Sequence, residues 1–465
     1  MCGCLVYGCY GGIEMKILHY TVGLNENRGG GLTKYVDDLA KSQIRDNNVM
    51  LLYPGEYNIL NKEVKIKREK NKGKMAIFSI INPLSLPMLF GLKDEDYLER
   101  KTSKSLWETF LKDNKIDIIH LHTLMGLYEE FIDAANELGI PMVYTTHDYF
   151  GLCTKQTFIY NNKICEHWDS CEDCPKCNIH AFSKKKTFII HSKLFCELRK
   201  NKLFLIIKSH AKSKIEHTDD APVNEETFDI SYYKELKSKY YRIFSKIDWF
   251  HFNSSISKYV FHRELPLING EIINITHRDI SDHRKEKAFD LEKLQITYLG
   301  PATAAKGFER LIYALDKIYK RDASFVLNIF TDSAIERKYI HKCGDRYEYS
   351  QLESIMDKTD ILVAPSVGYE TFGFTVREAL SYGVPVLVSD TLGAKDIVRD
   401  GENGYITNEE NLSETLMNIV SHKEQLKQLN HTILLDHFET FDEHCDKIIQ
   451  MYKNLCDRKN RVTVE

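Results

Sequence analysis

The 465-residue sequence has no uninterrupted run of 18 apolar residues. The nearest stretch, residues 75–92, contains Asn82, Pro83 and Pro87. Because a membrane-spanning helix needs about 20 predominantly apolar residues, we predict no such helix. An excess of positive charge is missing as well, since the formal net charge is −4. This argues against a dedicated nucleic-acid-binding protein.

Residues 1–14 lack the positive start and the long apolar run of a signal peptide. They precede what reads as an ordinary domain start at Met15. One hypothesis is that Gly11 and Gly12 come from a translated ribosome-binding site of a bacterial gene, so that Met15 is the true initiator. We therefore treat residues 1–14 as a possible non-native extension.

The length, with 43% hydrophobic and 28% charged residues, suits two ordinary cores and is too great for one. Strands alternate with helices in both halves, which predicts parallel, doubly wound α/β sheets. We expect a first domain at 15–287, a second at 288–438 and a final helix within 439–465. The expected strands are 16–20, 116–120, 142–146, 247–252, 295–299, 325–330, 361–365 and 386–389, and the expected helices are 32–45, 97–114, 127–138, 255–263, 350–358, 374–382 and 444–455.

The most informative segment is residues 366–404, a loop, a helix and a strand that follow a buried strand. A ligand is expected at the carboxyl end of such a strand. Glu370 lies in the loop and Glu378 in the helix, and the amides of residues 372–375 lie at the helix N-terminus, which favours an anion. Two acids at this spacing alone are more often solvated surface charge. The strand-loop-helix context favours a site for a sugar, a diphosphate and a ribose.

Residues 370–378 resemble the Glu-x7-Glu signature of the retaining glycosyltransferases of family 4, which have the two-domain GT-B fold. Gly-Val-Pro-Val at 383–386 and Gly-x-x-Asp-Ile-Val at 393–398 match the same family. The resemblance implies two Rossmann-like domains that face a cleft, with a C-terminal helix crossing back to the first domain. It covers nearly the whole chain from Met15 and is weakest over residues 153–229.

By position, the resemblance gives Glu370 the donor sugar and Glu378 the nucleotide ribose. Residues 300–307 resemble a loop whose Arg and Lys grip the donor diphosphate; Lys306 is retained, and Pro301 occupies the arginine position. Residues 145–148 resemble the loop whose His reaches the donor sugar or the acceptor. The expected catalytic residues are therefore His147, Glu370 and Lys306, and the expected donor-binding residues are Gly30, Gly31, Lys306, Glu370, Phe372, Gly373, Phe374, Thr375 and Glu378.

The resemblance implies a cytoplasmic retaining glycosyltransferase without a catalytic metal. It would move a sugar from a nucleotide-sugar donor to a glycan or lipid-linked acceptor, in cell-surface polysaccharide or glycoconjugate synthesis. Two alternatives stay open. A nucleotide-sugar epimerase shares the fold, and Pro301 in place of arginine fits a non-catalytic glycosyltransferase-like partner protein.

Five of the 12 cysteines are gathered in one part of the first domain: Cys153, Cys165, Cys171, Cys174 and Cys177. Disulfides are rare in cytosolic proteins, and four thiolates around zinc would hold a long loop that has little apolar content. We expect a structural zinc on Cys153, Cys165, Cys177 and either Cys174 or Cys171. Free thiols are the other interpretation.

Residues 184–214 contain ten Lys or Arg and a single acid, Glu197, interleaved with apolar residues. Such a segment on an acidic protein suggests peripheral contact with an anionic membrane, here at its inner face. An amphipathic helical insertion with a solvated charged face explains the same pattern. Nucleic-acid binding is a poorer third interpretation, because no recognised fold or stacking platform accompanies the charge.

Overall fold

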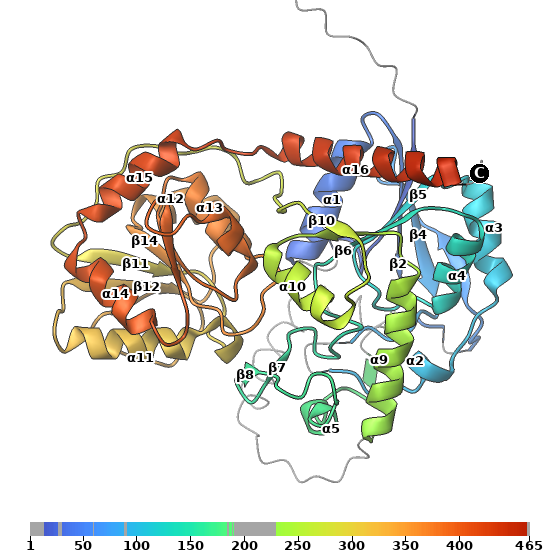
Figure 1. Ribbon diagram of the computed structural model, residues 1–465, viewed down its shortest axis with the longest axis horizontal. Coiled ribbons are helices and arrows are strands. Elements are labelled where there is room, and N and C mark those ends of the chain that lie inside the picture. The colour runs from blue at the N-terminus through green and yellow to red at the C-terminus, as the bar shows by residue number, and fades with distance from the viewer. Residues whose placement is uncertain are drawn as a thin grey trace, which may run out of the picture.

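The computed structural model describes residues 14–26, 30–58, 60–87, 91–183, 186–187, 189 and 229–462. These residues form two α/β units side by side, each built on its own sheet (Figure 1). The predicted α/β architecture of two parallel-sheet domains is therefore confirmed. Within the described residues, no helix combines the length and the apolar character that a bilayer crossing requires.

The first unit has an eight-stranded sheet in the order β10-β9-β6-β5-β1-β2-β4-β3. All neighbours are parallel except β3, which pairs antiparallel with β4 at the edge. The strands are β1 (Lys16–Tyr20), β2 (Asn48–Pro54), β3 (Lys65–Arg68), β4 (Ala76–Ile81), β5 (Ile118–Leu121), β6 (Met142–Thr145), β9 (Trp249–Phe252) and β10 (Gly270–Ile272).

The second unit has a six-stranded, fully parallel sheet in the order β13-β12-β11-β14-β15-β16. Its strands are β11 (Leu294–Tyr298), β12 (Phe325–Phe330), β13 (Ile340–Gly344), β14 (Ile361–Ala364), β15 (Val386–Ser389) and β16 (Gly404–Thr407). Its strands β14 and β15 are almost continuously apolar, as expected when helices cover both faces of a parallel sheet.

The helices cover both faces of each sheet. Those of the first unit are α1 (Gly31–Gln43), α2 (Asp96–Glu99), α3 (Lys104–Asn114), α4 (Glu129–Glu137), α5 (Cys174–Cys177), α9 (Ile230–Ser245) and α10 (Ser255–Glu264). Those of the second are α11 (Phe308–Tyr319), α12 (Leu352–Asp357), α13 (Phe374–Ser381), α14 (Leu412–Ser421) and α15 (Gln425–Leu435), followed by α16 (Phe441–Val462). Short 3₁₀ turns lie at Ala304–Lys306, Tyr349–Gln351 and Gly393–Ile397, and a hairpin joins β7 (Ile159–Tyr160) to β8 (Lys163–Ile164).

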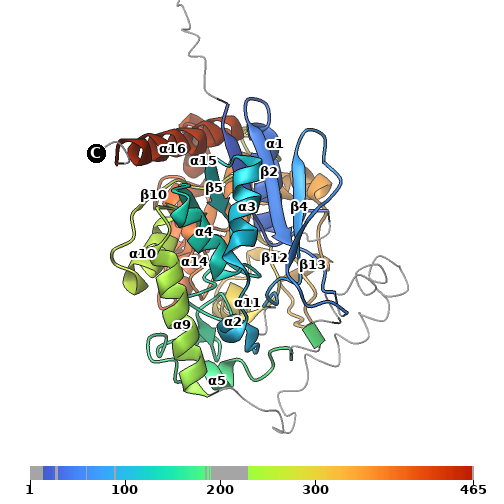
Figure 2. The ribbon, with the colours of Figure 1, turned by 90° about the vertical axis from the view of Figure 1, so that its right-hand side faces the viewer.

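Helix α16 follows the second unit in the chain but packs on the first, against α1. Figure 2 shows it lying across the first sheet, with α3 and α4 nearest the viewer. Its Tyr452 and His444 are fully buried there and form hydrogen bonds with His120 and Tyr35. The polypeptide thus crosses between the units twice.

The two units also touch directly along one edge. Ser254 Oγ donates to the main-chain oxygen of Thr371 at 2.6 Å. The carboxylate of Asp396, in the second unit, accepts from the main-chain nitrogen of Ser255 at 2.5 Å. Because acids are stabilised at a helix N-terminus, Asp396 caps α10 across the interface. It belongs to the Gly-x-x-Asp-Ile-Val segment, for which the sequence predicted no structural role.

Several elements differ from the sequence-based prediction, and the helices α9, α11, α14 and α15 and the strands β10, β13 and β16 were not predicted. The single helix expected over 97–114 is two helices, because Arg100 is extended and Trp107 Nε1 donates to Thr102 Oγ1 at 2.8 Å, which fixes the break before α3. The strand expected at 116–120 is Ile118–Leu121, since Lys115 turns the chain at a φ of 52°. The strands β2 to β4 were not predicted at all.

Candidate functional site

A cavity of about 430 Å³ lies between the two units. The first unit lines it with Gly30, Gly31 and Lys34 at the start of α1. The second lines it from the 3₁₀ turn at 304–306, the loop after β14 and the start of α13. Most of the predicted donor-binding residues meet here: Gly30, Gly31, Lys306, Glu370, Gly373, Phe374, Thr375 and Glu378.

Helix α13 begins at the cavity with a glycine. Gly373 has a φ of 108°, which strains any other residue, and a Cβ there would lie 2.8 Å from Leu392 Cδ1. Because glycine has no side chain, it cannot cap the helix. The first-turn amides of Phe374 and Thr375 therefore form a local positive end that borders the cavity.

Glu378 and His277 are buried at the wall of this cavity. Their side chains are each 6% exposed, and His277 Nε2 lies 3.7 Å from Glu378 Oε1. The other atom of each group, Glu378 Oε2 and His277 Nδ1, is buried without a hydrogen-bond partner among the described residues. Such groups are expensive to bury unpaired, so two of them facing one cavity indicate a place for an external donor and acceptor.

Glu370 is already paired on both oxygens. Lys306 Nζ donates to Oε1, and Ser366 Oγ donates to Oε2 at 2.6 Å. The Glu370 side chain is 24% exposed and that of Lys306 is 36% exposed. Two of the predicted catalytic residues therefore form one charge-assisted pair at the cavity surface.

The glycine-rich start of α1 brings the units together. A Cβ on Gly31 would lie 3.0 Å from the ring of Phe374, so a larger residue at this position would require the ring to shift. Lys34 stands one turn further on, with its Nζ 2.7 Å from Asp38 and 2.8 Å from Asp279. Pro301, which occupies the arginine position of the family pattern, lines the same cavity, and Lys34 and Lys306 both line it as cations.

His147 and Phe372 do not line the cavity in the described structure. Phe372 is 2% exposed and packs in the core below α13. The main-chain oxygen of His147 accepts from Thr371 Oγ1 at 3.0 Å, so His147 lies beside the loop that carries Glu370. Its ring is largely buried and contacts Tyr35, and burial lowers its pKa to about 3.

Sequence reasoning missed His277 and Lys34. Neither belongs to a recognised motif, and the fold brings both to the cavity that contains Glu370, which is more than 90 positions away from each in the chain. Lys34 had one available signal, since it stands one turn into the helix that follows a glycine-rich loop.

The five cysteines line one small apolar cavity of about 40 Å³ under α9. Cys171 and Cys174 form a side-chain hydrogen bond, which lowers the pKa of Cys171 to about 7 and raises that of Cys174. No three of the five sulfurs form a group within 4.8 Å, a limit that only His19, His120 and His122 meet among the described residues. The thiols thus surround one point without forming a compact ligand set.

The predicted membrane segment, 184–214, lies outside the described residues except for Lys186, Thr187 and Ile189.

Two family models match the chain. The model of the glycosyl transferases group 1 matches residues 279–433, on the second unit. The model of Glycosyltransferase Family 4 matches residues 29–168, on the first.

Curated relatives align with part of the chain. An uncharacterised glycosyltransferase of Methanocaldococcus jannaschii is 28% identical over 144 residues, 28% of this chain and 36% of that protein. An uncharacterised 41.2 kDa protein of the cps region of Klebsiella pneumoniae is 28% identical over 144 residues, 30% of this chain and 39% of that protein. The chain thus spans less than two-fifths of the length of these two relatives.

Solved structures resemble the whole fold. Sucrose-phosphate synthase from Thermosynechococcus elongatus has a TM-score of 0.57 at 12% identity, covering 95% of this chain and 99% of that one. The Anabaena protein HepE in complex with UDP and glucose has a TM-score of 0.52 at 13% identity, covering 95% and 100%. At these identities the likeness shows the architecture alone.

Proposed function

We propose that this chain, which has the GT-B fold and carries both family domains of a glycosyltransferase, transfers a sugar from a nucleotide-sugar donor with retention of configuration. The acceptor would be a glycan or a lipid-linked glycan in the synthesis of a cell-surface polysaccharide or glycoconjugate. The observation that carries the proposal is a buried carboxylate oxygen of Glu378 that has no partner among the described residues. It lies beside His277 in a cavity lined by both units.

Glu378 and His277 suit a ribose. Vicinal hydroxyls can donate to a carboxylate oxygen and to an imidazole nitrogen, or accept from the latter, and would satisfy both buried atoms at once. A hydrogen bond to a charged group contributes about 1.5–3 kcal/mol, more than one between neutral groups. We therefore assign the nucleoside to this end of the cavity.

The start of α13 and Lys306 suit the diphosphate. The helix amides supply donors at a positive helix end, and Lys306 adds a full charge one loop away. A diphosphate would give Lys306 a second anionic partner. Glu370, still held by Ser366, would then accept hydrogen bonds from hydroxyls of the sugar.

In the proposed reaction no carboxylate of the protein forms a bond to the sugar. The bond from the anomeric carbon to the diphosphate breaks, the acceptor oxygen bonds to the same face, and the departing phosphate oxygen takes the acceptor proton. Lys306 and the α13 amides stabilise the negative charge that develops on the leaving group. Closure of the cleft over the bound donor would exclude water from the site.

Binding and turnover can be tested together with a panel of sugar nucleotides. UDP-glucose is the first candidate, because the similar HepE structure holds UDP and glucose. A true donor at 100 times its Kd should add about 2.7 kcal/mol to the free energy of unfolding. The anomeric configuration of the product, read by NMR, then tests retention.

The same assay separates the alternatives. A product with the sugar still on the nucleotide would indicate an epimerase. Stabilisation by a donor, with no turnover on any glycan or lipid-linked acceptor, would indicate a non-catalytic partner protein. No stabilisation by any sugar nucleotide would refute the proposed function.

We further propose that the cysteines hold a structural zinc, supported by their convergence on one cavity. Four thiolates at about 2.3 Å from zinc would lie closer together than the five sulfurs do in this structure. Protein prepared without chelator should contain about one zinc per chain. Cys177→Ser should lower the metal content and leave nucleotide affinity unchanged, whereas far less than one zinc in the unsubstituted protein would leave the thiols free.

A peripheral position at the inner face of the membrane also stays a proposal, supported by the composition of 184–214. Vesicles of phosphatidylserine should sediment the protein at low salt, and neutral vesicles should not. Equal sedimentation with both would exclude an electrostatic contact.

A further inference from the structure

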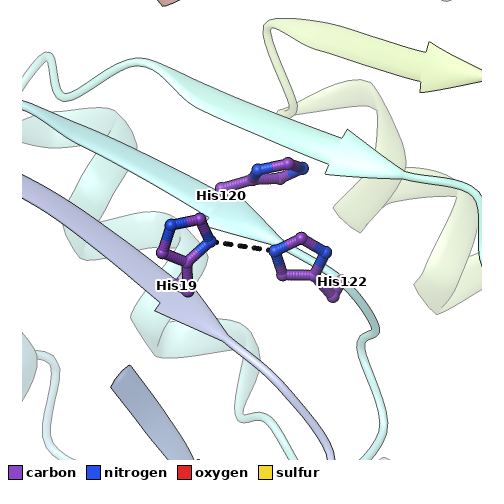
Figure 3. Close-up of side chains that lie close together, drawn as sticks. All are labelled: His19, His120 and His122. Atoms are coloured by element: carbon purple, nitrogen blue, oxygen red, sulfur yellow. Dashed lines mark hydrogen bonds between the residues drawn. The ribbon is translucent and has the colours of Figure 1, made fainter. Parts of the chain in front are cut away.

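A continuous chain of hydrogen bonds runs through the buried core of the first unit and ends at His147, beside the cleft. Three of its rings, from β1 and from the end of β5, are drawn in Figure 3. In order, its members are the main-chain oxygen of Ile273, His251, Thr145, His120, Tyr452, Gln43, His19, His122 and His147.

The carbonyl end gives the chain a direction. Ile273 O can only accept, so His251 Nε2, at 2.8 Å, must carry the proton. Burial lowers the pKa of His251 to about 4, so its ring is neutral and Nδ1 must accept. The hydrogen of the Thr145 hydroxyl, 2.8 Å away, is therefore directed to His251. Thr145 must then accept from His120 Nε2, at 2.5 Å.

The direction of donation continues through Tyr452 on α16 to Gln43 on α1. Burial also keeps His120 neutral by lowering its pKa, so its Nδ1 accepts from the hydroxyl of Tyr452. Having used its one hydrogen, Tyr452 accepts from Gln43 Nε2 at 3.4 Å, the longest link. This turns Gln43 Oε1 toward His19 Nε2, at 2.8 Å, which must donate.

The last two links determine the tautomer of His147. His19 Nδ1 accepts from His122 Nε2 at 2.9 Å, and His122 Nδ1 accepts from His147 Nε2 at 3.2 Å. All three rings are neutral, since burial lowers each pKa. The hydrogen of His147 is thus placed on Nε2, and its Nδ1 keeps a lone pair.

We propose that this hydrogen-bond chain keeps the hydrogen of His147 on Nε2 and so leaves Nδ1 as an acceptor, to which a hydroxyl of the bound donor or acceptor sugar donates. The inference rests on the proposed function. Thr145, Tyr452, Gln43, His19 and His122 are then positioning residues, since they act through His147. Thr371, next to Glu370, fixes the main chain of His147 at the same edge.

A metal ion on His19, His120 and His122 is the competing interpretation, because their ligand atoms lie within 4.8 Å of one another. However, all six ring nitrogens already take part in the hydrogen bonds given above. A metal would have to break at least two of these hydrogen bonds in a fully buried place. The geometry therefore favours the hydrogen-bond chain.

Thr145→Val removes one link of the hydrogen-bond chain and should reverse the direction of donation in the links that follow it. Without the hydroxyl, a hydrogen on His120 Nε2 has no acceptor, whereas one on Nδ1 can be donated to Tyr452. Each later link then changes direction, and His147 should carry its hydrogen on Nδ1. Thr145→Ser is the matched control, because it keeps the hydroxyl and should retain the original tautomer.

The readout is nitrogen-15 NMR of the full-length protein labelled on histidine, with the His147 signals assigned by their loss in His147→Asn. We expect a protonated Nε2 in the unsubstituted protein and in Thr145→Ser, and a protonated Nδ1 in Thr145→Val. A His147 tautomer that is unchanged by Thr145→Val would overturn the proposal. So would a joint shift of the His19, His120 and His122 signals on adding one equivalent of zinc.

Kinetics supply the second readout. For a lost neutral hydrogen bond, kcat/KM should fall about two- to tenfold in Thr145→Val, mainly through kcat, and recover in Thr145→Ser. If Thr145→Val does not fold, Tyr452→Phe breaks the chain at α16 and should give a mixture of both tautomers. Absence of any transfer in the unsubstituted protein would refute the proposed function alone, since the tautomer is read without substrate.

Discussion

The cleft and the histidine core beneath it differ in how their buried polar groups are satisfied. In the cleft, Glu378 Oε2 and His277 Nδ1 have no partner among the described residues. In the core, both ring nitrogens of His19, His120 and His122 are paired. An unpaired buried group costs about 1–3 kcal/mol. Unpaired groups therefore mark a place where a ligand supplies the partner, and paired groups mark a scaffold.

Acid should have the largest effect, because it lowers the free energy of unfolding of the unit that contains the histidine core. Burial holds the folded-state pKa of His19 and His251 near 4 and of His147 near 3, against 6.5 for an exposed ring. The unfolded chain thus binds protons first, and stability that is present above about pH 6.5 is lost as the pH falls toward 4. Each such histidine contributes about 1.4 kcal/mol per pH unit in this window.

Asp148 and Asp360 act in the opposite sense. Burial raises both carboxyl pKa values to about 6, so the folded state takes up their protons first and regains stability as the pH falls toward 4. The buried histidines outnumber them, and we expect a net loss on the order of 5 kcal/mol between pH 6.5 and 4.5. All three tryptophans lie in the first unit, so urea titrations followed by tryptophan fluorescence measure this loss there. Constant stability over this range would contradict a neutral histidine core.

Removing one core ring should cost stability and spare nucleotide binding. His251→Ala deletes a fully buried side chain and leaves the Thr145 hydroxyl and the Ile273 carbonyl without that partner. We expect a loss of about 3 kcal/mol in the free energy of unfolding, from the cavity and the unpaired groups. Exposed His431→Ala is the control. A larger effect on donor affinity than on stability would remove the distinction between core and cleft.

Substituting Glu378 should weaken nucleotide binding and spare stability. Glu378→Gln keeps the shape and removes the charge, so affinity for a nucleoside diphosphate should fall about ten- to hundredfold, the equivalent of about 1.5–3 kcal/mol. Stability should stay or rise, because a buried charge is removed. Calorimetric titration measures the affinity, with exposed Glu353→Gln as the matched control. Full affinity together with lost stability would place Glu378 in the scaffold.

Restoring the arginine of the family pattern should have the smallest effect. Pro301→Arg adds a third cation to a cavity that already contains Lys34 and Lys306. Pro301 is exposed, so the gain should be about 1 kcal/mol or less, up to fivefold in donor affinity, and should shrink with added salt. Weaker binding at low salt would show that the proline ring, or the loop shape that it fixes, is needed.

The parts that local sequence determines could be predicted. The strands β12 and β15 match the prediction residue for residue, because both are short apolar runs with turn signals on either side. Glu370 and Glu378 reach one cavity because the loop and helix that hold them are contiguous. A glycine-rich turn and a Lys-Gly pair likewise placed Gly31 and Lys306.

The rest depends on contacts between distant segments. His120 and Tyr452 are 332 positions apart, and no pattern around either residue indicates the other. His120 and His122 lie at and just past the end of β5, on the side where ligands bind in such sheets, yet both are fully buried parts of the core. His277 follows β10 in the first unit, and it becomes part of the cavity wall only because the second unit lies against the first there.

Helix α16 has a consequence for biosynthesis. Domains usually fold in order as the ribosome releases them, at about 5–20 residues per second. Here Tyr452 and His444 complete the core of the first unit, although they follow the whole second unit in the chain. The nascent first unit must therefore wait, on the order of ten seconds, before α16 can cover α1 and Tyr452 can pair with His120. We expect this surface to be open to chaperones during translation and closed once α16 has docked.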